Sequence, residues 1–134
     1  MNEEVMNGLK GLNLLYAEDN QTIQETTKRT LDLLFHHVYT AKDGLEALEI
    51  YKNNKIDIAL LDYIMPNMDG LTLVKEIYSL DEVKIPIIVA TGYSDEIEDK
   101  ESFERLSGKV WFIGKPLKYD EFLKTIQEVI ATSK

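Results

Sequence analysis

Five short apolar runs alternate along the chain with stretches whose apolar residues recur at helical spacing. Two runs, residues 12–17 and 85–90, are almost continuously apolar, which is typical of strands covered on both faces. Repeated alternation of strand and helix predicts an α/β fold, with a five-stranded parallel sheet doubly wound with five helices. The commonest order for five such strands is 2-1-3-4-5. The predicted strands are residues 12–17, 38–41, 56–61, 85–90 and 110–113.

Four of the intervening stretches carry an apolar stripe of the kind that an amphipathic helix presents to a core. A further stretch, residues 94–105, holds six acids, and its apolar residues Ile97 and Phe103 do not share a helix face. We therefore expect a weakly anchored fourth helix there, either with a solvated acidic face or with a surface that partners read. The four stripes are Ile23, Thr27, Leu31 and Leu34; Leu45, Leu48 and Tyr51; Leu73, Val74 and Ile77; and Phe122, Ile126, Val129 and Ile130.

The composition is that of an ordinary globular domain. The 134 residues suit one domain, and we expect residues 1–10 to be an N-terminal tail and residues 11–134 to be the domain. The chain has no cysteine, and its sequence has neither a signal-peptide pattern nor a run of apolar residues long enough to span a membrane. These features favour the cytoplasm. A formal net charge of −9 disfavours direct binding to nucleic acid, because an acidic surface repels phosphate backbones.

Charged and polar side chains stand where the predicted strands end. Glu18 and Asp19 follow the first strand, Asp62 follows the third, and Thr91 and Lys115 follow the fourth and fifth. In the order 2-1-3-4-5 the first and third strands are neighbours at the topological switch point, and ligands bind beyond the carboxyl ends of such strands. The sequence therefore predicts that three carboxylates converge in one crevice, with a hydroxyl and an ammonium on the same rim.

This set of side chains suits phosphoryl chemistry beside a metal ion. Three close carboxylates raise one another's pKa unless a cation lies among them. Oxygen ligands suit a hard cation, and Mg²⁺ commonly takes one or two carboxylates together with waters and phosphate oxygens. A carboxylate can also attack phosphorus and form an aspartyl phosphate. We therefore expect Asp62 to accept a phosphoryl group beside Mg²⁺, while Lys115 neutralises the phosphoryl oxygens and Thr91 donates to them.

The same residues resemble the response-regulator receiver family, the CheY-like domains of two-component phosphorelay signalling. The resemblance runs over about residues 12–130 and implies a flavodoxin-like (CheY-like) fold. Each of the matching pieces is a weak indicator alone, but together they are highly specific. The pieces are Glu18-Asp19, Asp62 followed by Met65-Pro66-Asn67-Met68-Asp69-Gly70, Thr91-Gly92, and Lys115-Pro116.

The resemblance implies roles for the acids. Asp62 would be the phospho-acceptor, and its donor would be a histidine kinase or a phosphotransfer protein. Asp19 would be a direct Mg²⁺ ligand, and Glu18 would bind the metal directly or through water. Asp62 and the backbone carbonyl of Ile64 would complete the protein's share of the metal ligands.

The resemblance also implies how the phosphoryl group is held and read. Thr91 and Lys115 would contact it, and Phe112 falls at the position of the family's switch aromatic. The surface of the fourth helix, fifth strand and fifth helix would then change and signal to a downstream protein target. The chain would be a monomer or a phosphorylation-dependent dimer. It would not be an enzyme acting on other molecules and would catalyse only its own phosphorylation and dephosphorylation. A cis peptide bond between Lys115 and Pro116 is also expected.

The same residues also allow other interpretations. Asp62 could cap a turn, Glu18-Asp19 could be acids favoured at a helix N-terminus, and Phe112 could be a plain core residue. An aspartate-based phosphatase would need a second acid where Ile64 stands, and an FMN protein would need a glycine- and hydroxyl-rich loop after the first strand. A receiver-fold scaffold acting without phosphorylation would be expected to lack a site residue, and none is missing. A receiver excised from a larger regulator or hybrid kinase stays open. His36-His37 lie between the first helix and the second strand, which favours a loop or helix-end role over a metal or phosphohistidine site.

Overall fold

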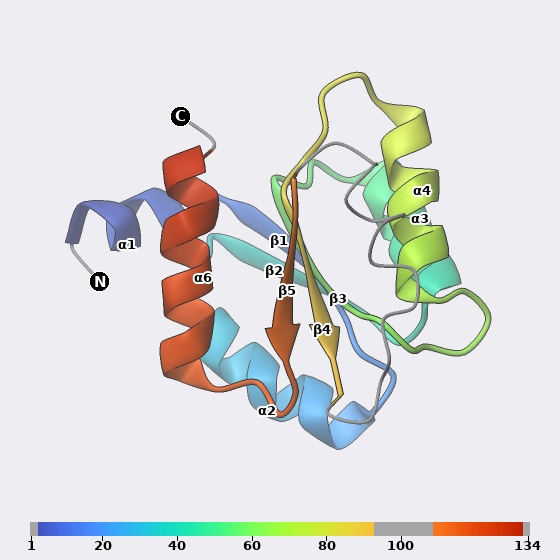
Figure 1. Cartoon of the computed structure of the whole chain (residues 1–134), viewed down its shortest axis with the longest axis horizontal. Coiled ribbons are helices and arrows are strands. Elements are labelled where there is room, and N and C mark those ends of the chain that lie inside the picture. The colour runs from blue at the N-terminus through green and yellow to red at the C-terminus, as the bar shows by residue number, and fades with distance from the viewer. Residues whose placement is uncertain (1–2, 93–108, 133–134) are drawn as a thin grey trace.

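Five parallel strands form one sheet in the order β2-β1-β3-β4-β5, which confirms the predicted topology (Figure 1). The computed structural model describes residues 3–92 and 109–132. None of the helices in these ranges combines the length and the apolar character needed to cross a bilayer. The strands are β1 (Asn13–Ala17), β2 (His37–Ala41), β3 (Ile58–Asp62), β4 (Ile87–Thr91) and β5 (Val110–Gly114). The helices are α1 (Glu3–Leu9), α2 (Gln21–Leu31), α3 (Gly44–Asn53), α4 (Gly70–Leu80) and α6 (Tyr119–Thr132).

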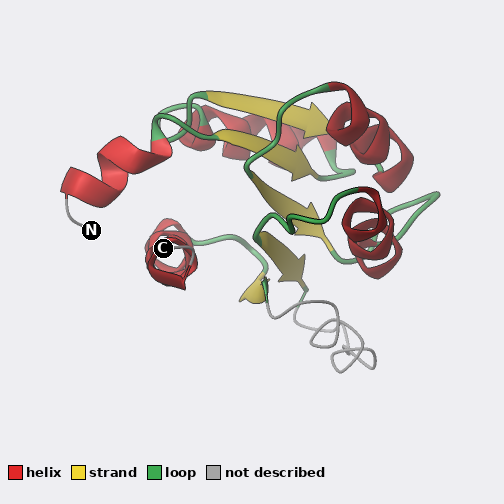
Figure 2. Ribbon diagram, turned by 90° about the horizontal axis from the view of Figure 1, so that it is seen from above, coloured by secondary structure: helices red, strands yellow, loops and turns green. Residues whose placement is uncertain are grey.

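Helices lie on both faces of the sheet, so the central strands are covered on both sides (Figure 2). Successive residues of a strand point to opposite faces. In β1, Leu15 and Ala17 pack with α3 and α4, whereas Leu14 and Tyr16 pack with α1, α2 and α6. All five residues of β3 are buried, including Asp62 at its end. The sheet therefore holds the Asp62 carboxylate at the carboxyl end of its central strand.

Two strands start and end later than predicted. Strand β3 begins at Ile58 rather than at residue 56, and β4 begins at Ile87 rather than at residue 85. Pro86 has no N–H to donate to a ladder, which explains why the apolar run before Ile87 does not pair as a strand. As a result Asp62 and Thr91 are the last residues of their strands rather than the first residues beyond them.

Two residues of the predicted helical stripes are exposed instead of buried. Leu45 is 50% exposed, because α3 turns Ala47 and Leu48 towards the core. Ile23 is 44% exposed, because it borders a cavity of about 250 Å³ rather than a packed side chain. Spacing alone placed both residues on the apolar face, and the packing of each helix decided otherwise.

The residues predicted to be an N-terminal tail include helix α1. Its last residue, Leu9, is fully buried in the core layer beneath α2 and α6. A seven-residue helix is too short to display a periodic stripe, and isolated helices of this length are unstable in water. Contacts with the rest of the fold, rather than local propensity, therefore hold α1 in place.

Candidate functional site

Three carboxylates meet at the carboxyl edge of the sheet. Strands β1 and β3 are hydrogen-bonded neighbours, with Ala17 opposite Leu61, so the residues that end them lie together. The carboxylate oxygens of Glu18, Asp19 and Asp62 lie within 4.8 Å of one another. Glu18 and Asp62 are buried, with 3% and 6% of their surface exposed, whereas Asp19 is exposed. The predicted convergence of these acids is therefore present.

The Lys115 ammonium bridges the two buried acids. Its Nζ lies 3.1 Å from Glu18 Oε1 and 2.9 Å from Asp62 Oδ2. The backbone of Lys115 is tied to the end of β4, because its N–H donates to the carbonyl oxygen of Thr91 at 2.7 Å. The peptide bond between Lys115 and Pro116 is cis, as predicted.

Burial raises the pKa of the Asp62 carboxyl from its ordinary value of 3.8 to about 6. The hydrogen bond from Lys115 opposes this rise, while the negative charges of Glu18 and Asp19 add to it. Burial alone would lower the pKa of Lys115, but its hydrogen bonds to Asp62 and Glu18 outweigh burial and leave that pKa raised. At neutral pH the site therefore holds an ionised Asp62 beside a charged ammonium.

The donor set fits a divalent metal ion. Three carboxylates converge in a partly buried site, and one ammonium contacts two of them, so negative charge remains uncompensated there. The raised pKa of Asp62 reflects this repulsion in part. Closely spaced carboxylate oxygens are the ligands that Mg²⁺ prefers. Glu18, Asp19 and Asp62 would hold such an ion.

The other predicted residues lie near this edge, but their roles stay predictions. Thr91 ends β4 opposite Gly114, and Phe112 lies in β5 opposite Val89. Phe112 is partly buried against the core layer beneath α3 and α4. Ile64 follows β3 with its side chain exposed. The predicted fourth helix, residues 94–105, lies outside the described residues.

Two residues that the sequence analysis did not single out also shape the site. The Asn20 N–H donates to Glu18 Oε2 at 3.1 Å, and the Asn20 side chain caps α2. Gln24 Nε2 donates to the carbonyl oxygens of Glu18 and Ala41 at 3.0 and 2.9 Å, and so links the ends of β1 and β2. Asn before a predicted helix is a recognisable cap, but nothing in the sequence marks Gln24.

The cavity of about 250 Å³ beside α2 reaches the site from one side. Glu18, Asp62 and Lys115 line one part of it, and apolar side chains line most of the rest. Its walls come from α2, from the strands beneath it and from the residues after Lys115. Glu18 and Asp62 are therefore reachable from this side although both are buried.

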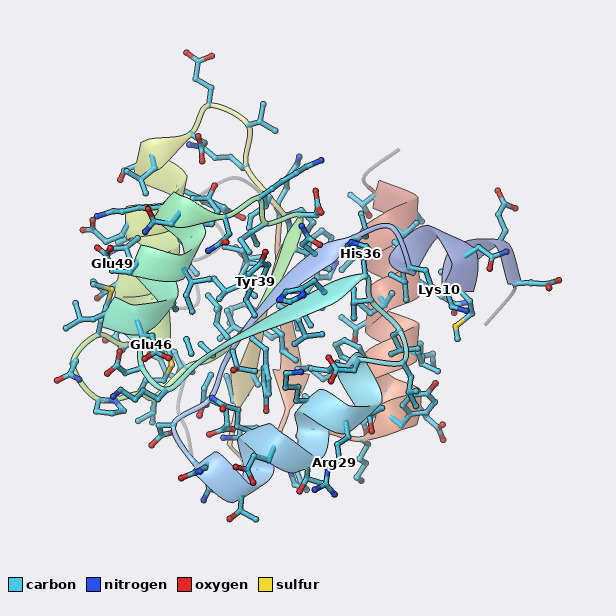
Figure 3. The ribbon with its side chains drawn as sticks, turned by 180° about the vertical axis from the view of Figure 1, so that it is seen from behind. Lys10, Arg29, His36, Tyr39, Glu46 and Glu49 are labelled. Carbon is cyan, nitrogen blue, oxygen red and sulfur yellow. The ribbon has the colours of Figure 1, made fainter. Side chains whose placement is uncertain are left out.

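The histidine pair lies apart from the acid cluster. His37 begins β2, and its ring lies 4.2 Å from the ring of Tyr39, centroid to centroid. Figure 3 shows His36 at the amino end of β2, whereas the acids lie at the carboxyl ends of their strands. Strand β2 therefore includes His37, one of the two residues predicted to lie in a loop or at a helix end.

Known proteins resemble this chain both in sequence and in fold. A family model described as the response regulator receiver domain matches residues 14–127. The solved structure of the Vibrio cholerae chemotaxis protein CheY4 resembles this chain with a TM-score of 0.77 and 28% identity, covering 89% of this chain and 98% of CheY4.

Two curated relatives are longer proteins. The response regulator MprA of Mycobacterium sp. (strain KMS) is 28% identical over 117 residues, which cover 87% of this chain and 50% of MprA. The probable transcriptional regulator ycf27 of Cyanidium caldarium is 33% identical over 117 residues, which cover 87% of this chain and 45% of ycf27. The chain thus spans about half the length of these relatives. Its sequence, fold and strand-end residues agree: the chain belongs to the response regulator receiver domain family.

Proposed function

We propose that this receiver domain accepts a phosphoryl group on Asp62 from a phosphohistidine of a histidine kinase or a phosphotransfer protein. The observation that carries the proposal is the buried Asp62 carboxylate, whose Oδ2 lies 2.9 Å from Lys115 Nζ at the carboxyl edge of the sheet. Burial of two carboxylates, Glu18 and Asp62, costs stability. A scaffold without phosphoryl chemistry gains nothing from that cost, which argues against the scaffold alternative.

In the proposed step, a carboxylate oxygen of Asp62 attacks the phosphorus of the phosphohistidine. The bond between phosphorus and the imidazole nitrogen breaks, and that nitrogen keeps the electron pair and takes up a proton. The product is an aspartyl phosphate, a mixed anhydride that water can later hydrolyse. The domain would catalyse only these two reactions on itself, and no separate substrate is proposed.

Positive charge is what this step needs from its surroundings. A bound Mg²⁺ would supply charge neutralisation for the phosphoryl oxygens. The Lys115 ammonium, which contacts both Glu18 and Asp62, would supply a second positive charge from just beyond the end of β5. The Thr91 hydroxyl would donate to a phosphoryl oxygen from the end of β4.

The phosphorylated state would be read through Thr91 and Phe112. An inward movement of the Thr91 hydroxyl would leave space that Phe112 fills by rotating towards the core, which biases a two-state surface. The surface would include β5, α6 and residues 94–105, and it would bind a downstream protein.

We place the protein in the cytoplasm, as a monomer or a phosphorylation-dependent dimer. The proposed extent of the domain is residues 11–134. We propose that this domain binds neither nucleic acid nor membrane.

The test is chemical labelling of Asp62. Incubation with a small acyl-phosphate donor and Mg²⁺ should add one phosphoryl group to the wild type, measured by intact mass, and hydroxylamine should remove it because it cleaves acyl phosphates. Asp62→Asn should stay unlabelled. Asp69→Asn is the matched control, because Asp69 caps α4 and asparagine caps equally well. Equal labelling of the wild type and Asp62→Asn would refute the assignment.

A further inference from the structure

The turn between β2 and α3 is hydrogen-bonded to the loop between β3 and α4. Asn67 Nδ2 donates to Asp43 Oδ2 at 2.9 Å, across 24 residues of sequence. Asp43 is buried, with 8% of its surface exposed. Its other oxygen, Oδ1, accepts from the Glu46 N–H at 2.8 Å and caps α3. One carboxylate therefore both starts a helix and holds the neighbouring loop.

The backbone at Asn67 is in the left-handed region, with φ of 71°. Glycine adopts this conformation without steric cost, and asparagine is one of few other residues that tolerate it. Backbone geometry alone would therefore be met at least as well by glycine. What asparagine adds is the amide that reaches Asp43.

Direct packing accompanies the hydrogen bond. A Cβ added at Gly44 would lie 2.7 Å from Met68 Cβ and closer still to the Met68 carbonyl oxygen, so glycine is needed for this approach. Met68 itself packs against the core layer beneath α3 and α4. Figure 3 shows this amino-terminal part of α3, marked by Glu46, one turn before Glu49.

The held loop is the one that leaves the phosphorylation site. It runs over residues 63–69, directly after Asp62, and contains Ile64. At its start the Tyr63 N–H donates to Ala90 O at 2.9 Å, and the Gly70 N–H, just past its last residue, donates back to Tyr63 O at 2.7 Å and joins the two ends. Between these ends the loop is held by the bond from Asn67 to Asp43. Ile64 therefore lies on a segment that is anchored at both ends.

We infer that Asp43 and Asn67 are positioning residues that hold the loop in the shape that presents the Ile64 carbonyl to a divalent cation. The inference rests on the proposed function, which makes that carbonyl a metal ligand. Outer contacts of this kind orient metal ligands, and their loss typically weakens metal binding about tenfold or more. Neither side chain touches the carboxylate cluster in the described contacts, so their effect would pass through the loop.

The experiment removes the hydrogen bond between Asp43 and Asn67 while it keeps the helix cap at residue 43 and the left-handed backbone at residue 67. Asp43→Ser keeps a side chain that caps α3 but lacks the second oxygen. Asn67→Gly keeps the left-handed backbone but lacks the amide. The double variant closes a thermodynamic cycle. Asp69→Ser is the matched control, because it also removes one acid from a helix cap at this edge of the sheet.

Two measurements are made on each variant. The first is the Mg²⁺ dissociation constant, which should rise about tenfold in both single variants and no further in the double variant. The second is the set of amide chemical shifts and exchange rates of residues 63–68 without metal, which should change in the same way in Asp43→Ser and Asn67→Gly. Asp69→Ser should leave the Mg²⁺ dissociation constant close to the wild type, and its amide changes should be confined to the residues next to the substitution.

The outcomes distinguish the inference from the function on which it rests. Wild-type affinity for Mg²⁺ in both single variants would overturn the positioning role and leave the proposed metal site standing. Lower thermal stability with unchanged Mg²⁺ affinity would show a purely structural bond and would also overturn it. If the wild type itself bound no Mg²⁺ while Asp62 was still labelled, the metal site and the inference would both fall.

Discussion

The Nζ of Lys115 lies between the buried carboxylates of Glu18, which follows β1, and Asp62, which ends β3. Its contact with Asp62 is the shorter of the two, 2.9 Å against 3.1 Å. Removal of the ammonium would leave Asp62 without the hydrogen bond that now opposes the rise of its pKa. The same ammonium is therefore expected to affect both the charge of Asp62 and the rate at which Asp62 attacks phosphorus.

Lys115→Met should slow labelling of Asp62 by a small acyl-phosphate donor by roughly ten- to a hundredfold, because the phosphoryl oxygens lose a preorganised positive charge. The rate is followed by intact mass under saturating Mg²⁺. Lys118→Met, at an exposed position three residues later, is the control and should label at the wild-type rate. A wild-type rate in Lys115→Met would remove Lys115 from the proposed chemistry.

Stability without metal should depend on pH through Asp62. Its folded pKa of about 6 lies above its ordinary 3.8, so folding favours the protonated form and stability is lost as pH rises between these values. Asp62→Asn should therefore raise the free energy of unfolding above pH 6, by on the order of 2 kcal/mol, and change it little below pH 4. Denaturant unfolding of both proteins in a chelator across this pH range measures the difference. A constant difference at every pH would contradict the assignment.

Mg²⁺ should stabilise the wild type and do so through Asp19. A ligand that binds only the folded state adds about 2.7 kcal/mol at a hundred times its dissociation constant. Asp19→Asn should weaken Mg²⁺ binding and remove most of the rise in melting temperature. Glu82→Gln, which neutralises an exposed acid after α4, should behave as the wild type. If the two variants gained equal stability from Mg²⁺, Asp19 would not be a ligand.

Phosphorylation should change amide exchange at Thr91 and along β5, with little change in β1 and α2. The physical reason is that a charge-assisted hydrogen bond to the phosphoryl group is stronger than the neutral bonds it replaces. Phe112→Ala should leave labelling of Asp62 intact while it reduces these exchange changes and weakens discrimination by the partner. Changes of equal size in β1 and α2 would speak against this route of communication.

Leu9→Ala should lower the free energy of unfolding by about 2–4 kcal/mol, because Leu9 is fully buried and its truncation leaves a cavity. Leu33→Ala is the control: Leu33 is 75% exposed, and its loss should change stability by less than about 0.5 kcal/mol. Labelling of Asp62 should survive both changes. A negligible effect of Leu9→Ala would show that the burial of Leu9 contributes little to the stability of the fold.

The primary sequence was sufficient for the sheet and for the acid cluster. Parallel strands linked through helices all end at one edge, so residues that follow successive apolar runs must share that edge whatever the details of packing. This is why Glu18, Asp62 and Lys115 could be placed together although nearly a hundred residues separate the first from the last. The strand order was predicted separately, as the commonest order for five parallel strands of this kind.

Only the tertiary structure decided which side chains became buried and which loops touch. Leu9 is buried because α1 docks on the fold, and Leu45 is exposed because α3 turns a different face inward. The bond between Asp43 and Asn67 joins two loops that lie 24 residues apart, and no periodic pattern marks such a contact. Periodicity reports which face of an element is apolar, whereas contacts between loops depend on how whole elements are placed in space, which residue spacing does not encode.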